Sequence, residues 1–156
     1  MNNIELVRKK QHIDDLFKKI EVVSMDLKLH SEWAKYLCIV VSGFLENSVR
    51  ILYSKYARDT SSPSVANFVE AKLKDFQNPK MQKILDLAGL FSQKWKEELN
   101  RDTEGEIKDA VDSIANNRNR IAHGGDVGIT YIQIKEYYEK ALEVVELIEK
   151  QCKCNQ

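Results

Sequence analysis

The chain has 156 residues, 43% of them hydrophobic and 31% charged, which fits one globular domain and excludes fibrous and intrinsically disordered proteins. Lysine plus arginine number 24, and aspartate plus glutamate also number 24, so the formal net charge is zero. A neutral chain has no global basic field that could hold a nucleic acid by counterion release. Any contact with a nucleic acid must therefore be local.

The sequence predicts a cytoplasmic protein without a membrane span. Its longest nearly apolar stretch, residues 36–45, is about half of the roughly 20 residues that a spanning helix needs. The N-terminal segment becomes charged early and lacks the apolar core of a signal peptide. Three cysteines cannot all pair, and no further ligands complete a zinc site with the Cys-x-Cys tail, so we expect reduced thiols and neither metal nor cofactor.

Two prolines and six glycines, with charges spread evenly along the chain, predict an all-α fold with long helices and few turns. Apolar residues at steps of three to five predict a first helix over residues 3–28. Its expected inward positions are Ile4, Val7, Leu16, Ile20, Val23 and Leu27. His12 has the same spacing and is expected at the surface. A second helix, capped by Ser31, is apolar over most of its circumference and should be the central one. Its expected inward positions are Trp33, Tyr36, Leu37, Val40, Val41, Phe44, Leu45, Leu52, Tyr53 and Tyr56.

Short helices are predicted in the middle of the chain. Turn residues lead to Ser62 or Ser64 as the cap of the first one. Asn78 and Pro79 precede the second, and Gly89 marks its end. The predicted helices cover residues 65–76, 80–87 and 92–100.

Two long helices are predicted after them. Thr103 and Glu106 have the spacing of a capping box, and the helix that they begin should end near residue 122, before the pair Gly124 and Gly125.

A second capping box, Thr130 with Gln133, opens a final helix through about residue 151. Its expected inward positions are Tyr131, Ile134, Tyr137, Tyr138, Ala141, Leu142, Val145 and Ile148. No repeat or linker interrupts the chain, so residues 1–156 are expected to form a single domain.

Arg118 interrupts the apolar stripe of the helix that begins at Glu106. The stripe consists of Ile107, Val111, Ile114 and Ile121, and the position that it demands between the last two is Arg118. Removing water from an unpaired guanidinium costs several kcal/mol. The sequence therefore predicts that Arg118 has an anionic partner or faces a wet cleft.

Asn119 and His123 lie one helical turn apart, next to Arg118. A guanidinium binds phosphate oxygens, an amide orients them, and an imidazole moves a proton near neutral pH, which together suit phosphodiester chemistry. One chain offers one such histidine, so a two-fold dimer would supply both a base and an acid.

The same residues allow structural interpretations. Arg118 can form a buried salt bridge with Glu46 or another carboxylate, and His123 can be an ordinary helix end. Arg120 competes with Arg118 for the phosphate role. Ser42 and Glu46, one turn apart in the central helix, either support the site by orienting Arg118 or are polar groups of helix packing.

Residues 117–124, NRNRIAHG, contain the pattern R-N-x-x-x-H and resemble the signature of HEPN domains. Residues 33–53, WAKYLCIVVSGFLENSVRILY, are similar to the second helix of the RiboL-PSP-type HEPN group. The resemblance covers essentially the whole chain. It implies a compact HEPN-type bundle with two long N-terminal helices, short middle helices and a long C-terminal helix.

The resemblance also implies a metal-independent endoribonuclease with a site built across a homodimer, acting in toxin–antitoxin, abortive-infection or antiviral-defence systems. Arg118, Asn119 and His123 match the motif and are the expected catalytic residues. The expected partners are RNA and possible antitoxins of the nucleotidyltransferase type or other defence proteins. The alternative function is a non-catalytic HEPN module that binds a partner protein or a nucleotide.

Overall fold

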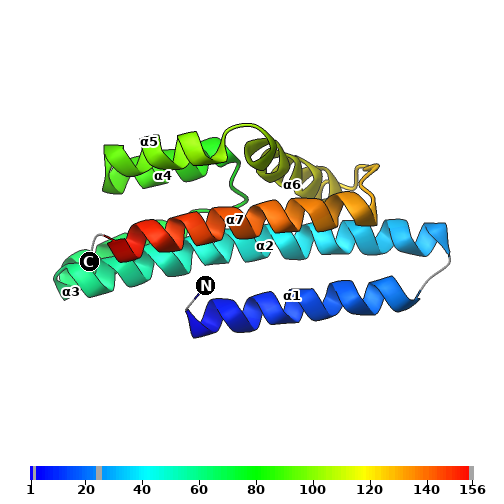
Figure 1. Ribbon diagram of the computed structural model, residues 1–156, viewed down its shortest axis with the longest axis horizontal. Coiled ribbons are helices and arrows are strands. Elements are labelled where there is room, and N and C mark those ends of the chain that lie inside the picture. Colours follow the sequence, from blue (N-terminus) through cyan, green and yellow to red (C-terminus); the bar gives the residue numbers. More distant parts are fainter. Residues whose placement is uncertain (2, 24–25, 155–156) are drawn as a thin grey trace.

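A computed structural model describes residue 1, residues 3–23 and residues 26–154. These residues form seven α-helices and no strand, so the predicted all-α fold is confirmed. The helices are α1 (Ile4–Val23), α2 (Leu27–Thr60), α3 (Pro63–Leu73), α4 (Met81–Phe91), α5 (Gln93–Thr103), α6 (Glu106–Ala122) and α7 (Tyr131–Cys154). In Figure 1, α2 and α7 run side by side along the long axis, with α1 on one side of them and α4, α5 and α6 on the other.

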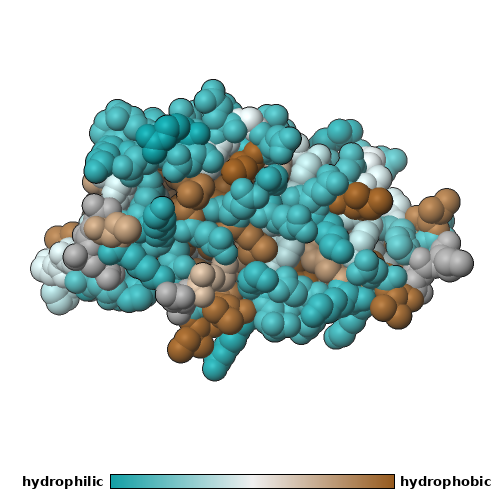
Figure 2. Space-filling model, in the orientation of Figure 1, coloured by the Kyte–Doolittle hydropathy of each residue, from teal (hydrophilic) through white to brown (hydrophobic). Residues whose placement is uncertain are grey.

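The helix α2 is the centre of the bundle, as its sequence predicts. It contains a segment that is long and apolar enough to cross a membrane, and 61% of that segment is buried inside the fold. It packs against α1, α3, α6 and α7. This burial among four other helices explains why α2 is apolar on most of its sides. Charged and polar side chains cover most of the face seen in Figure 2, with separate apolar patches between them.

The predicted start of α2 is wrong, because Asp26 and not Ser31 is its cap. The Asp26 carboxylate accepts a hydrogen bond from the backbone N–H of Lys28 at 2.9 Å, and the helix begins at Leu27. The first helix correspondingly ends at Val23 and does not continue to residue 28. Residues 24 and 25 of that predicted helix, and the side chain of Val23, lie outside the described residues.

The buried face of α1 also differs from the prediction. Its buried residues are Leu6, Ile13, Phe17 and Ile20. The expected inward residues Ile4 and Val7 are exposed, as is Leu27 at the start of α2, while His12 is exposed as expected. Steps of three to five residues fit more than one face of a helix that covers only one side of the bundle, so the neighbouring helices decided which face is buried. In α2, Tyr36 was likewise expected inside and is 45% exposed.

The predicted end of α4 at residue 87, before Gly89, is wrong, since the helix continues through this glycine to Phe91. A Cβ at Gly89 would lie 3.0 Å from the side chain of Lys96, so this glycine allows α4 and α5 to pack closely. The next helix, α5, ends at Thr103, three residues beyond its predicted end. The predicted cap Ser62 is confirmed in position before Pro63, although its side chain makes no capping hydrogen bond.

The first of the two predicted capping boxes is wrong. Thr103 is the last residue of α5, and its hydroxyl donates to the Leu99 carbonyl at 2.7 Å, so Gly105 takes the cap position of α6 with φ of 84°. The second box is confirmed: the Gln133 N–H donates to the Thr130 hydroxyl at 3.2 Å, and the Thr130 N–H donates to the Gln133 side chain at 3.0 Å. The cap fixes where α7 begins and where the loop after α6 ends.

Candidate active site at the end of α6

The end of α6 has the hydrogen bonds of a Schellman motif, as the two glycines predict. Gly124 is left-handed with φ of 73°, and its N–H donates to the Ile121 carbonyl at 3.0 Å. The N–H of Gly125 donates to the Arg120 carbonyl at 2.8 Å. This pair of bonds closes the helix and leaves His123 as its C-cap. The imidazole of His123 is exposed, and it makes no hydrogen bond with the described part of the chain.

Arg118 lies one turn beyond the buried residue Ile114 on α6 and is half-buried. Its guanidinium forms neither a hydrogen bond nor an ion pair with any residue that the structure describes. The predicted alternative of a salt bridge with Glu46 is wrong, because that carboxylate pairs with Arg50 at 3.3 Å. An arginine that is partly buried and has no counterion among the described residues is suited to receive an anion.

Asn78 connects three of the predicted site residues. Its side-chain oxygen accepts from the Ser42 hydroxyl at 3.1 Å, and its backbone N–H donates to the Glu46 carboxylate at 2.7 Å. Its side-chain NH₂ group donates to the amide oxygen of Asn119 at 2.8 Å and to the Ala115 carbonyl at 3.3 Å. The structure thus brings Ser42 and Glu46 to Asn119 through Asn78, and not to Arg118.

Sequence reasoning missed Asn78 as a site residue and gave it only the role of preceding a helix. One signal was present, because Asn is the residue other than Gly that most readily adopts a left-handed backbone. Asn78 does so, with φ of 40°. Its partners are 36 and 41 residues away along the chain, at Ser42 and Asn119, and no local pattern connects such distances.

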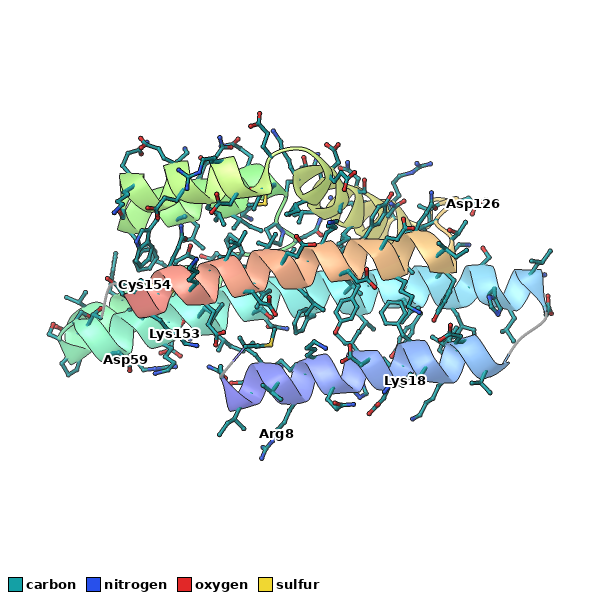
Figure 3. All side chains as sticks on the ribbon, viewed as in Figure 1. Arg8, Lys18, Asp59, Asp126, Lys153 and Cys154 are labelled. Carbon is teal, nitrogen blue, oxygen red and sulfur yellow. The ribbon has the colours of Figure 1, made fainter. Side chains whose placement is uncertain are left out.

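Arg120, the other candidate for the phosphate role, binds the loop that follows the helix. Its guanidinium donates to the Asp126 carbonyl at 3.0 Å. The Asp126 carboxylate pairs with Lys35 of α2 at 3.4 Å, and hydrogen bonds to Glu32 and then to Asp126 raise the pKa of that lysine. Figure 3 shows Asp126 in the loop between α6 and α7, which follows the C-cap residue His123 in the chain. Arg120 therefore fastens the end of the motif to the bundle.

One of the three cysteines contacts α6, and the other two lie near the end of α7. The Cys38 thiol donates to the Ile114 carbonyl at 3.7 Å, and Cys152 is buried, while Cys154 is exposed. Burial raises the pKa of Cys38 to about 11 and that of Cys152 to about 12. All three thiols are free. Within the described ranges, no group of three or more His, Cys, Asp or Glu side chains is arranged to hold a metal ion.

A comparison with protein families matches nearly the whole chain to a known family. The family model described as RiboL-PSP-HEPN matches residues 4–153, which is nearly the whole chain and includes all seven helices except the last residue of α7. Comparisons with curated proteins and with solved structures give no significant match.

Proposed function

The chain belongs to the RiboL-PSP HEPN family, and from this premise we propose that it is an endoribonuclease whose site is formed by two copies of the chain. In the proposed reaction the 2′-oxygen of a ribose bonds to the adjacent phosphorus, and the bond from phosphorus to the 5′-oxygen breaks. A base removes the 2′-hydroxyl proton, and an acid protonates the departing 5′-oxygen. The products carry a 2′,3′-cyclic phosphate and a 5′-hydroxyl.

The observation that carries this proposal is the state of Arg118. Its guanidinium interrupts an apolar stripe and meets no carboxylate among the described residues. A phosphate oxygen would satisfy it with a charge-assisted hydrogen bond, and the charge that develops on phosphorus in the transition state would strengthen that bond. Arg118 is therefore proposed to bind and stabilise the scissile phosphate.

His123 is proposed to transfer the protons. Its imidazole is exposed at a helix end that two glycine-dependent hydrogen bonds hold in place. Side chains can supply the base, the acid and the charge stabilisation, so the proposed reaction needs no metal ion. Two imidazoles can act as one base and one acid, and a two-fold axis close to His123 would bring the second one from the other copy.

An apolar stripe on α2 supports a dimer interface next to this site. Ile39 is 44% exposed and lies one helical turn from both Lys35 and Ser42. Ser42 contacts Asn78, and Lys35 pairs with Asp126, so both lie next to the end of α6. Tyr36, 45% exposed, extends the stripe. Covering these side chains would remove apolar surface from water and bring two copies together at the motif.

We place this activity in a cytoplasmic toxin or antiviral-defence effector that cuts RNA. Such an effector requires a partner that restrains it, and an antitoxin of the nucleotidyltransferase type is the proposed class. Because the net charge is zero, the chain has no general attraction for nucleic acids, and we expect RNA to contact it only locally, at the site.

The test is cleavage of end-labelled RNA by the purified protein in EDTA. Arg118→Ala and His123→Ala should each lower the rate by about a hundredfold or more. Arg8→Ala and His12→Ala are matched controls, since both side chains are exposed on α1, and Figure 3 shows Arg8 pointing away from the bundle. Both controls should cut at the wild-type rate and give 2′,3′-cyclic phosphate ends.

Three results would overturn the proposal. The first is cleavage that survives both site substitutions, and the second is cleavage that EDTA abolishes. The third is a wild-type protein that cuts no RNA and still binds a partner protein or a nucleotide through this surface, which would establish the non-catalytic module instead.

A further inference from the structure

The loop between α3 and α4 carries Asn78, and hydrogen bonds from α2 hold this loop in place. Arg50 of α2 donates to the carbonyls of Phe76 at 2.9 Å and Lys74 at 2.8 Å, and it also pairs with Glu46. Glu46 in turn accepts the backbone N–H of Asn78. The central helix therefore holds this loop by both its carbonyls and its N–H, and it places Asn78 against the end of α6.

We infer that Asn78 is a positioning residue, which fixes the side-chain amide of Asn119 so that its NH₂ group faces the substrate phosphate beside Arg118. This inference rests on the proposed function and names a residue that the R-N-x-x-x-H motif does not contain. It follows from which atoms in the contact can donate and which can only accept.

The Ala115 carbonyl determines the orientation of Asn78. A backbone carbonyl can only accept a hydrogen bond, so the Asn78 atom that faces it must be the NH₂ group. The opposite orientation would place the Asn78 oxygen against that carbonyl oxygen. The Ser42 hydroxyl, which can donate, then faces the Asn78 oxygen at 3.1 Å.

The orientation of Asn78 determines that of Asn119 in turn. The same NH₂ group of Asn78 lies 2.8 Å from the Asn119 side chain, so the Asn119 atom at that contact must be the oxygen. Asn119 is exposed, and its NH₂ group makes no hydrogen bond with any described residue. In this inference that group is left free to donate to the same phosphate as the neighbouring Arg118.

Asn78→Asp tests the inference because it keeps the shape and removes the donor. The introduced carboxylate would accept from Asn119, whose amide would turn and present its oxygen to the phosphate. RNA cleavage at neutral pH should fall by about tenfold or more. Asn119→Ala should cause a similar loss, and the double variant should be no slower than Asn119→Ala alone. Asn100→Asp, an exposed asparagine of α5, is the matched control and should cut normally.

The pH profile separates positioning from a structural effect. A protonated aspartate again has a donor for the Asn119 oxygen. The Ala115 carbonyl oxygen, which faces this side chain, favours the protonated form and should raise the pKa of the introduced carboxyl group above about 4, while the charges of the nearby Glu46 and Arg50 offset each other. The rate of Asn78→Asp relative to wild type should therefore rise as the pH falls from 7 to about 5. A constant ratio over this range would contradict the inference.

The orientation itself has a readout that does not depend on cleavage. In ¹⁵N NMR spectra the side-chain NH₂ signals of Asn119 should move in Asn78→Asp and stay in place in Asn100→Asp. If Asn78→Asp does not fold, Asn78→Gly keeps the left-handed backbone, deletes the contact and should also move these signals.

The proposed function and the role of Asn78 can be refuted separately. Wild-type protein that cuts no RNA refutes the proposed function, while the Asn119 signals still decide the orientation. Unmoved signals, wild-type cleavage by Asn78→Asp, or losses that multiply in the double variant would each overturn the role of Asn78.

Discussion

Arg118→Met is expected to make the protein more stable and inactive. Arg118 lies on the side of α6 that carries the buried residues Val111 and Ile114, and it has no counterion among the described residues. Methionine is also unbranched, forms helices well and adapts to irregular packing. The substitution therefore continues the apolar stripe without removing a hydrogen bond or an ion pair that the structure contains.

The size of the effect follows from burial. Burying a whole side chain of this size contributes about 1.5–3 kcal/mol, so a half-buried position gives about 1 kcal/mol. For a chain of 156 residues, this gain corresponds to a rise in Tm of about 2–4 °C. Cleavage of RNA should fall by about a hundredfold or more, because the phosphate loses its guanidinium.

Thermal and urea unfolding followed by circular dichroism would measure the change at several protein concentrations, since dimer formation makes Tm depend on concentration. Arg120→Met is the matched control. It removes the hydrogen bond to the Asp126 carbonyl at an exposed position and should lower the free energy of unfolding by about 0.5–1 kcal/mol. A loss of 1 kcal/mol or more in Arg118→Met would refute the reasoning, because the guanidinium would then stabilise the fold.

Two further predictions concern the surface and the thiols. Ile39→Arg should halve the mass measured by light scattering and abolish RNA cleavage, while the helix content stays unchanged. Val22→Arg, at a residue 86% exposed on α1, should change neither the mass nor the cleavage rate. A dimer that persists in Ile39→Arg would reject the proposed interface. Because burial raises the pKa of Cys38 to about 11 and that of Cys152 to about 12, a thiol reagent at pH 8 should label Cys154 alone in the folded protein. Equal labelling of all three cysteines would contradict this prediction. Both buried thiols ionise more readily in the unfolded chain, so the free energy of unfolding should fall as the pH rises above about 9.

The sequence by itself determined the features that depend on a few neighbouring residues. The Thr130 and Gln133 cap, the glycine-terminated end of α6 and the apolar stripe that Arg118 interrupts were all predicted correctly. Their hydrogen bonds and periodicity involve residues three to five positions apart, and such signals are present in any short segment.

Only the tertiary structure decided which face of α1 is buried, why α4 continues through Gly89, and that Glu46 pairs with Arg50 instead of Arg118. It also brought Asn78 to Asn119 across 41 positions of the chain. These outcomes depend on which helices meet and on which donors and acceptors are left over when they do. Local periodicity contains no information about such partners, because they are chosen by packing between segments that are distant along the chain.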